Sequence, residues 1–410
     1  MGGKTWQRNL VALWFGQTMV MVAFSFFFPF IPLYVQTMGV DSAAEAAQWA
    51  GFISASSSIT MAVTQPIWGT LADRRGRKPM VIRSMLSGGI LTGLMGFAAT
   101  PQQLLVLRFI QGGLTGTIAA SNALVASSTP RKRLGFALGL MQVGVFAGTS
   151  IGPLIGGLMA DFFGYRSAFY ASGILMTLAG LLVIALVHED FTPPAAGAKQ
   201  PSMWKGSRAL FGIAIFPIVI GVIFMIQLGG VVISPVLSLF IADLSGGANV
   251  ATAAGVVMGL TGAVSAASAL ALGRVSDRLG PRLVLPVCLA GAALSYVPQA
   301  FVQNVGQLLA LRLLLGACLG GLMPSANALL ARATPPEHRG SAFGLSATAS
   351  SLANFVGPLS GAAIATHLGL RAVFLVTGVL FAVAWTWATL GFRRAAMAPQ
   401  PPRPRTDGEA

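Results

Sequence analysis

The sequence predicts an all-α integral membrane protein with twelve transmembrane helices in two related six-helix bundles. Its composition is the first reason: 55% of the 410 residues are hydrophobic, only 9% are charged, and the mean hydropathy is +0.76. Soluble domains do not have this composition. The second reason is a duplicated basic motif, GTLADRRGRKP at 69–79 and GRVSDRLGPR at 273–282. Apolar runs about as long as a membrane span flank both copies.

The duplication extends well beyond the basic motif. QLLVLR at 103–108 matches QLLALR at 307–312 and, after one inserted residue, the Gly-Pro pair at 152–153 matches the pair at 357–358. Spans four to six therefore repeat as spans ten to twelve. Two parallel halves of this kind are typical of alternating-access transporters, which hold the substrate between the halves.

Twelve apolar segments are long enough to cross about 30 Å of hydrocarbon. We expect spans at 10–34, 49–71, 79–99, 102–124, 135–160, 166–187, 209–241, 251–273, 282–302, 305–330, 341–366 and 371–392. They form an N-terminal bundle at 1–187 and a C-terminal bundle at 209–392. The stretch at 188–208 is expected to be a cytoplasmic linker, and the proline-rich tail at 393–410 to be disordered.

Lysine and arginine are distributed unevenly among the predicted loops. With the N-terminus in the cytoplasm, the outer loops hold only Arg166 and Arg371. Because cations mark cytoplasmic loops, both termini and both basic motifs are expected to face the cytoplasm. The net charge of +15 reflects this topology. The cations form no continuous basic face, so nucleic-acid binding is not expected.

Several motifs resemble those of the major facilitator superfamily, and more narrowly its twelve-span bacterial drug:proton antiporters. GTLADRRGRKP resembles the superfamily's loop between spans two and three, and LLVLRFIQGGLTG at 104–116 is similar to the antiporters' span-four motif. WQRNLVALWFG near the start and GLRAVFLVTG at 369–378 are similar to one group of multidrug efflux proteins. The resemblance implies a monomer in a bacterial inner membrane that exchanges a small lipophilic substrate for protons as its halves rock.

Each basic motif combines a carboxylate, cations and glycines. The carboxylate can pair with a cation or a partner helix end, and the glycines permit close approach and a tight turn. We expect the motifs to latch the halves together at the cytoplasmic side in one state. The alternative is a surface ion pair worth under about 1 kcal/mol. The latch residues are Gly69, Asp73, Arg74, Gly76, Arg77, Lys78, Gly273, Asp277, Arg278, Gly280 and Arg282.

Span five carries a stripe of small residues. Gly144, Gly148, Gly152 and Gly156 are spaced four apart, with Pro153 and Gly157 beside them. The stripe lets another helix approach closely, and the proline adds a bend. A static packing seam is the simplest interpretation. The stripe resembles the antiporters' span-five motif, which points to export and implies a tight gate at the outer side.

Two arginines begin about two turns inside the outer ends of spans four and ten, namely Arg108 and Arg312. An arginine at a span centre costs about 2.5–3.5 kcal/mol, so each should face water or a partner, or snorkel to the surface. The resemblance implies a proton-coupling role for Arg108, with Gln111 one turn away. The position that matches Gln111 beside Arg312 is not a glutamine, so snorkelling stays open there.

No carboxylate lies clearly in the middle of a predicted span, although many proton-driven relatives have one. The remaining candidates are Asp73 at the inner side, and Asp161 and Asp243 at outer span ends. Each could equally be a solvated helix-end charge, and we favour that interpretation for Asp243. The repeat partner of Asp161 is Thr366, so Asp161 is present in one half only.

By resemblance, spans one, four, seven and ten surround the substrate cavity. Amides inside a span need partners, and methionine with phenylalanine forms an adaptable apolar surface. Taken singly, each apolar residue is better explained by packing or lipid contact. The cavity candidates are Gln17, Met19, Phe24, Phe28, Asn122, Met225, Gln227, Arg312 and Asn327. The low charge of this set favours lipophilic substrates over sugars and phosphorylated metabolites.

Signals of an enzyme are missing from the sequence. There is no phosphate-binding loop of the GxxxxGK type, and His188, His338 and His367 occur singly. We therefore expect no cofactor and no metal, with transport driven by an ion gradient. The leading hypothesis is a proton-driven exporter of hydrophobic drugs. The alternatives are a transporter of an endogenous metabolite or nutrient and a membrane sensor or scaffold that transports nothing.

Overall fold

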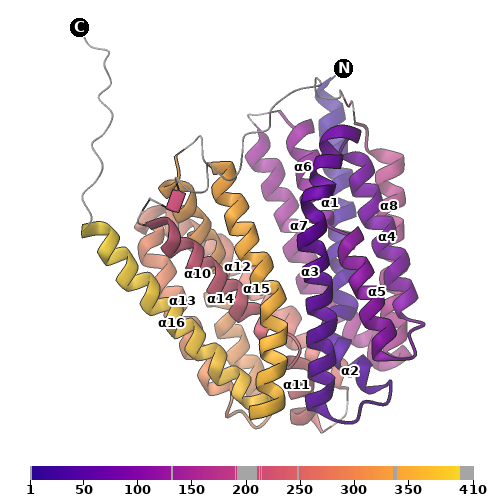
Figure 1. The fold of residues 1–410 in the computed structure, drawn as a ribbon, viewed down its shortest axis with the longest axis vertical. Coiled ribbons are helices and arrows are strands. Elements are labelled where there is room, and N and C mark those ends of the chain that lie inside the picture. The colour runs from indigo at the N-terminus through magenta and orange to yellow at the C-terminus, as the bar shows by residue number, and fades with distance from the viewer. Residues whose placement is uncertain are drawn as a thin grey trace.

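A computed structural model describes residues 2–130, 133–189, 191, 210–211, 213, 215–246, 249–335 and 339–397. These residues form helices and connecting loops, without a strand among them. Figure 1 shows two helical bundles side by side, one coloured indigo to magenta and the other rose to yellow. The all-helical, two-bundle fold predicted from the sequence is confirmed.

The N-terminal half divides two of its predicted spans. Span one bends at a short 3₁₀ segment that begins next to Pro29, and Pro32 follows in the next helix. Span four is interrupted at Gly116, whose φ of +130° is rarely adopted by residues with side chains. The elements are α1 (Gly2–Phe27), η1 (Phe28–Phe30), α2 (Ile31–Gln36), α3 (Ala43–Arg75), α4 (Lys78–Met95), α5 (Pro101–Leu114), α6 (Thr117–Ser128), α7 (Leu134–Phe163) and α8 (Tyr165–Leu186).

The C-terminal half divides span seven, because Pro235 has no N–H to donate and disfavours a continuous helix. Span ten is continuous, even though Gly320 matches Gly116. The elements are α10 (Ile215–Val232), α11 (Leu237–Ser245), α12 (Val250–Leu279), α13 (Pro281–Gln299), α14 (Val305–Ala333), α15 (Arg339–Leu368) and α16 (Leu370–Met397). Spans one, four and seven are thus interrupted, a feature that the lengths of the apolar runs did not indicate.

Nine segments in the described part of the chain are long and apolar enough to cross a membrane. The helices at predicted spans two, three and eleven, α3, α4 and α15, are less apolar. Serine and threonine recur in α3 and serine and glycine in α15, while α4 contains Lys78 and Arg83. These three helices occupy their predicted places, although composition alone does not identify them as spans.

The last helix extends beyond its predicted end. α16 continues to Met397, so the predicted start of disorder at 393 is corrected by five residues. Alanines and two arginines favour a helical C-terminus, since cations there interact well with the helix dipole. Residues 398–410 lie outside the described residues, as do 190 and 192–208 of the predicted linker, and the predictions for them stay predictions.

The two halves meet along the helix pairs α3–α15 and α7–α12. We term the end that holds the start of α1 and both basic loops the inner end, and the opposite end, with α2 and α11, the outer end (Figure 1). A Cβ atom added at Gly51 would meet Pro358 and Ala362, and one at Gly255 would meet Pro153. These tight contacts between the halves lie in the outer parts of the four helices.

Near the inner end, the same helices have free space beside them. A Cβ atom at Gly69, Gly139 or Gly273 would meet nothing within 4 Å. Large apolar side chains of these helices are also exposed there, including Ile67 and Leu270. The halves are therefore packed together at the outer end and separated at these inner positions.

Candidate functional site

Arg108 is buried in the N-terminal half, with 3% of its surface exposed. Its guanidinium donates a hydrogen bond to Gln111 Oε1 at 2.7 Å. The guanidinium carbon lies 5.6 Å from the ring centres of Phe24 and Phe28 and 5.7 Å from that of Phe27. Aromatic faces attract a cation at such distances, most strongly where water is excluded. The charge is thus stabilised by rings of span one and by one amide.

Gln111 holds this guanidinium in place. While its oxygen accepts from Arg108, its Nε2 donates to Thr92 Oγ1 at 2.7 Å and to the Gly88 carbonyl at 3.3 Å. Because both ends of the amide are engaged, its orientation is fixed and α5 is joined to α4. The structure brings the predicted pair together. The sequence did not relate Phe27 or Thr92 to Arg108, because neither is near Arg108 along the chain.

The interruption of span four lies just beyond this pair. It frees backbone carbonyls, of which Gly113 accepts from Trp68 Nε1 at 2.7 Å and Leu114 accepts from the Ser87 hydroxyl at 3.3 Å. Broken spans of this kind often surround binding sites in transporters. The half-spans α5 and α6 therefore give the N-terminal half a polar interior near the middle of span four.

Three polar side chains of this region lack hydrogen-bond partners. Gln17 is 1% exposed, yet neither atom of its amide has a partner. The Ser121 hydroxyl and the Asn122 Oδ1 are also unpaired. A buried polar group without a partner costs about 1–3 kcal/mol, so water or a ligand is expected to satisfy it. This supports Gln17 and Asn122 as candidates for binding.

The C-terminal half contains a barer version of the arginine site. Arg312 is 5% exposed and lies 5.7 Å from the ring centres of Tyr296 and Phe374. As in Arg108, its Nε has no partner, but here one terminal nitrogen is unpaired as well, and Leu315 stands where the other half has Gln111. Since the side chain is buried, the alternative that Arg312 snorkels to the outer surface is wrong.

The remaining cavity candidates lie on facing helices. Gln227 of α10 donates to Asn354 Oδ1 of α15 at 3.0 Å. Both amides belong to the C-terminal half, so one predicted cavity residue has a partner in its own half. The other candidates of this group are half-buried: Met19, Met225 and Asn327.

The first basic loop binds to its own half. The backbone N–H groups of Arg77 and Lys78 donate to the two carboxylate oxygens of Glu189 at 2.8 and 2.7 Å. The Arg77 guanidinium donates to the Ala123 carbonyl and the Lys78 ammonium to the Ile184 carbonyl. The side chain of Asp73 lies outside the described residues. A latch between the halves therefore stays a prediction.

Glu189 was not among the predicted site residues. Its carboxylate caps the N-terminus of α4, where backbone N–H groups lack helical partners. The signal was available: an acid directly after span six lies at the same membrane side as the start of span three. In the second loop, by contrast, the charged latch residues are exposed, namely Asp277, Arg278 and Arg282.

The glycine stripe of span five faces α1 of the same half. Added Cβ atoms would meet Trp14 and Thr18 at Gly144, Met21 and Val22 at Gly148, Val22 and Ser25 at Gly152, and Phe26 at Gly156. Only Gly157 and Pro153 of the motif contact α12 in the other half. The stripe is thus a packing seam within one half, and its C-terminal end reaches the interface.

Asp161 lies at this interface as well. Its Oδ2 accepts a hydrogen bond from the Thr252 N–H at 2.6 Å, and its Oδ1 accepts one from the Ala251 N–H at 3.2 Å. Both donors belong to the first turn of α12 in the other half. Asp161 is therefore a bound carboxylate and the alternative of a solvated charge is wrong, whereas Asp243 is exposed as that alternative describes.

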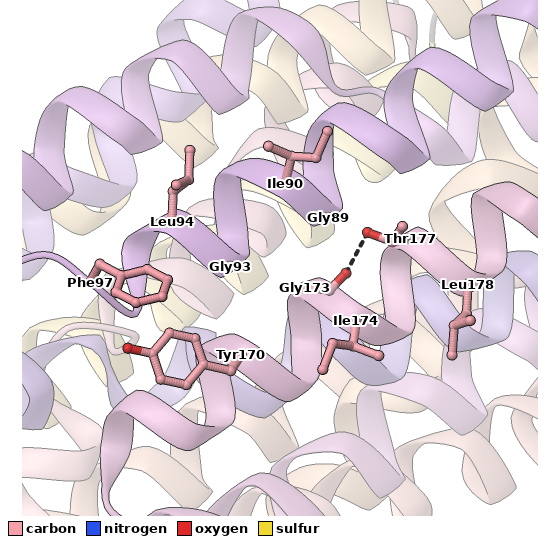
Figure 2. A pocket seen from close by; sticks show the side chains of 10 residues that line it. All are labelled: Gly89, Ile90, Gly93, Leu94, Phe97, Tyr170, Gly173, Ile174, Thr177 and Leu178. Atoms are coloured by element: carbon pink, nitrogen blue, oxygen red, sulfur yellow. Dashed lines mark hydrogen bonds between the residues drawn. The ribbon is translucent and has the colours of Figure 1, made fainter.

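A groove of about 430 Å³ lies between α4 and α8, away from these residues. Figure 2 shows its apolar lining, with Gly89, Gly93 and Gly173 where the helices approach and Ile90, Phe97 and Ile174 beside them. The last three side chains are largely exposed. The groove therefore lies on the exposed side of the bundle, the surface with which a membrane protein contacts lipid.

Comparisons with known proteins match this chain to one family. The model of the Major Facilitator Superfamily matches residues 13–246 and 219–409. The chain is 39% identical to the multidrug resistance protein MdtG of Serratia proteamaculans, over 96% of both chains, and 36% identical to MdtG of Salmonella dublin, over 96% of this chain and 98% of that one.

Two solved structures share the fold. A bacterial homologue of the human lysosomal transporter Spinster, in an inward-facing and unoccupied conformation, aligns with a TM-score of 0.78 at 17% identity, over 98% of this chain and 100% of that one. The nucleoside transporter NupG aligns with a TM-score of 0.79 at 15% identity, over 94% and 100% of the two chains.

Proposed function

This chain belongs to the major facilitator superfamily, and from that premise we propose that it exports lipophilic drugs or toxic compounds in exchange for protons. It is a multi-pass membrane protein and a transporter of the drug-efflux type rather than an enzyme. We place it in the inner membrane of a bacterium, working as a monomer. Its relatives named multidrug resistance protein, aligned over almost the full length, support the direction of transport and the substrate class.

The buried Arg108 site is the observation on which the proposal rests. Arg108 has no carboxylate partner among its described contacts, and the unpaired amide of Gln17 and hydroxyl of Ser121 occur in the same half. Aromatic rings and neutral polar groups suit a lipophilic ligand better than a sugar or phosphate. We assign Arg108 and Gln111 to proton coupling, with Asp73 and Asp161 as the acids that could accompany them.

Alternating access accounts for the way the halves meet. They are packed together at the outer end and separated at Gly69, Gly139 and Gly273 toward the inner end, as expected of an inward-open state. The Spinster homologue of the same fold is described as inward-facing, which supports this interpretation. Rocking the halves would close the inner end, where we expect the basic loops to act as a latch.

The experiment is dye efflux from energised cells, measured with a lipophilic fluorescent cation and with or without an uncoupler. We expect uncoupler-sensitive efflux that is lost in Arg108→Ala and Asp73→Asn at equal protein levels. Arg394→Ala is the control, since that side chain is exposed. If the native protein moves no dye but transports a metabolite, the drug-export assignment falls and the metabolite alternative replaces it. If it moves neither, the sensor alternative replaces it.

A further inference from the structure

We propose that Asp161 is the latch of the outer gate: its carboxylate caps α12 across the interface between the halves and stabilises the conformation in which the outer end is closed. This inference rests on the alternating access proposed above. It concerns the outer end, opposite the basic loops, and it gives Asp161 a role in holding the two halves together there.

The cap has the geometry of a true helix N-cap. Thr252 and Ala251 lie in the first turn of α12, where backbone N–H groups have no partner within the helix. Each donates to one oxygen of Asp161, at 2.6 and 3.2 Å. The preceding residue, Asn249, makes no side-chain cap of its own. The other half therefore supplies the group that α12 lacks.

A negatively charged cap is favoured at the start of a helix. A carboxylate at a helix N-terminus is favoured by the helix dipole as well as by its hydrogen bonds. Gly157, one turn before Asp161, has no side chain to hold the helices apart, and an added Cβ atom would meet Ala251 and Thr252. Close approach and cap thus depend on each other, so separation of α7 and α12 must break both hydrogen bonds.

The matching position in the repeat makes a much weaker contact. Thr366 of α15 donates to the Ala44 carbonyl of α3 at 3.4 Å, and to Ala362 of its own helix at 2.9 Å. The start of α3 already has a cap, because Ser42 accepts from the Glu45 N–H. The halves therefore meet at the outer end through two matched helix pairs, α7–α12 and α3–α15. Of these described contacts, the one between α7 and α12 includes a charged side chain that caps the partner helix.

This asymmetry predicts which state Asp161 favours. Its two bonds exist only while the outer ends are together, so they stabilise the inward-open state relative to the outward-open one. A group that interacts with one of two states shifts the equilibrium by the amount of that interaction. Removing the charge should move the population toward the outward-open state.

The test measures the outer gate directly. Spin labels are attached to Phe163→Cys at the end of α7 and Phe301→Cys after α13, both exposed positions. Double electron–electron resonance in lipid nanodiscs then measures the distance between the two labels, and so the separation of the halves at the outer end. Cys288 and Cys318 are replaced by alanine in every sample. We expect Asp161→Asn to raise the open-to-closed ratio at least tenfold, equal to about 1.4 kcal/mol. Asp161→Thr, which copies the other half, should do the same.

The control is Thr366→Val at the matching position, for which we expect less than a twofold change. The latch is overturned if the folded Asp161 variants keep the distance distribution of the parent, or if Thr366→Val shifts it equally. Hydrogen exchange at Ala251 and Thr252 supplies an independent readout, and unchanged protection in Asp161→Asn would also overturn the latch. If the shift occurs but the native protein exports no dye, the proposed function fails and the latch stands.

Discussion

A matched pair of glycines in the two halves makes the same kind of close contact. Gly156 of α7 lies against Phe26 of α1, and its counterpart Gly361 of α15 lies against Val232 of α10. In each half, a close helix pair is built on a glycine that leaves no room for a side chain. The packing of this helix pair is therefore duplicated in the two halves.

The polar groups at matched positions are not duplicated. The N-terminal half has Gln111, Asp161 and Glu189 where the other half has Leu315, Thr366 and Arg394. In the described part of the chain, all three make hydrogen bonds that their counterparts do not make. The comparison teaches that a duplicated fold needs its close contacts in both halves, whereas a charge or an amide with a specific task is needed once.

The two buried arginines give the largest expected difference between the halves. We expect Arg108→Ala to lower drug efflux about a hundredfold and Arg312→Ala less than tenfold, because only Arg108 has a side-chain amide partner at this site. A charge-assisted hydrogen bond is worth about 1.5–3 kcal/mol. Initial rates in inside-out vesicles measure both. Equal losses would show that the halves contribute alike and would break the comparison.

The glycine pair should instead show equal effects. Gly156→Ala and Gly361→Ala each insert a methyl group against backbone, which costs about 2 kcal/mol in a tight seam. Thermal unfolding of the purified protein measures the loss. Gly139→Ala is the control on α7, where the space is open, and should be neutral or slightly stabilising. A much larger cost in one half would mean that packing is as asymmetric as polarity.

Exchanging the residues beside the arginines sharpens the comparison further. Gln111→Leu copies the C-terminal half and removes the partner of Arg108, so we expect about a tenfold loss of uncoupler-sensitive efflux. Leu315→Gln offers Arg312 the missing amide and should change efflux less than twofold. Proton-linked and unlinked dye movement are measured together. A large effect of Leu315→Gln would place coupling in both halves.

The inner-end cap gives the smallest expected difference. Glu189→Gln removes the charge that accepts hydrogen bonds from the backbone N–H groups of Arg77 and Lys78. This substitution should lower the free energy of unfolding by about 1 kcal/mol, as for other helix caps. Arg394→Gln at the matching position is exposed and should be neutral within a few tenths. Hydrogen exchange at the start of α4 checks the mechanism. Unchanged exchange in Glu189→Gln would contradict it.

Sequence patterns predicted the features that depend on local spacing. Apolar run lengths located the helices, and the three-residue spacing of Arg108 and Gln111 put both on one helix face. The break at Gly116 was missed, because a glycine inside a span can serve close packing or a positive φ, and the letters do not distinguish them. Gly320, its match, remains helical.

Contacts between distant segments could not be predicted. Asp161 was recognised as asymmetric, but its partners are backbone N–H groups about 90 residues away, which carry no side-chain signature. The sequence predicts Phe24 and Phe28 as cavity or packing residues but does not relate them to Arg108, since that relation depends on how α1 rotates against α5. Three-dimensional packing supplied both relations.

The cap at Glu189 also bears on the order in which the protein is assembled. Glu189 follows the last helix of the first half, and it fastens the loop that joins α3 to α4. During synthesis, the first half can therefore complete this hydrogen bonding before any helix of the second half has left the ribosome. Asp161 has to wait until α12 is inserted. The cap at Glu189 thus stabilises the first half on its own, while the cap at Asp161 joins the two halves after each has formed.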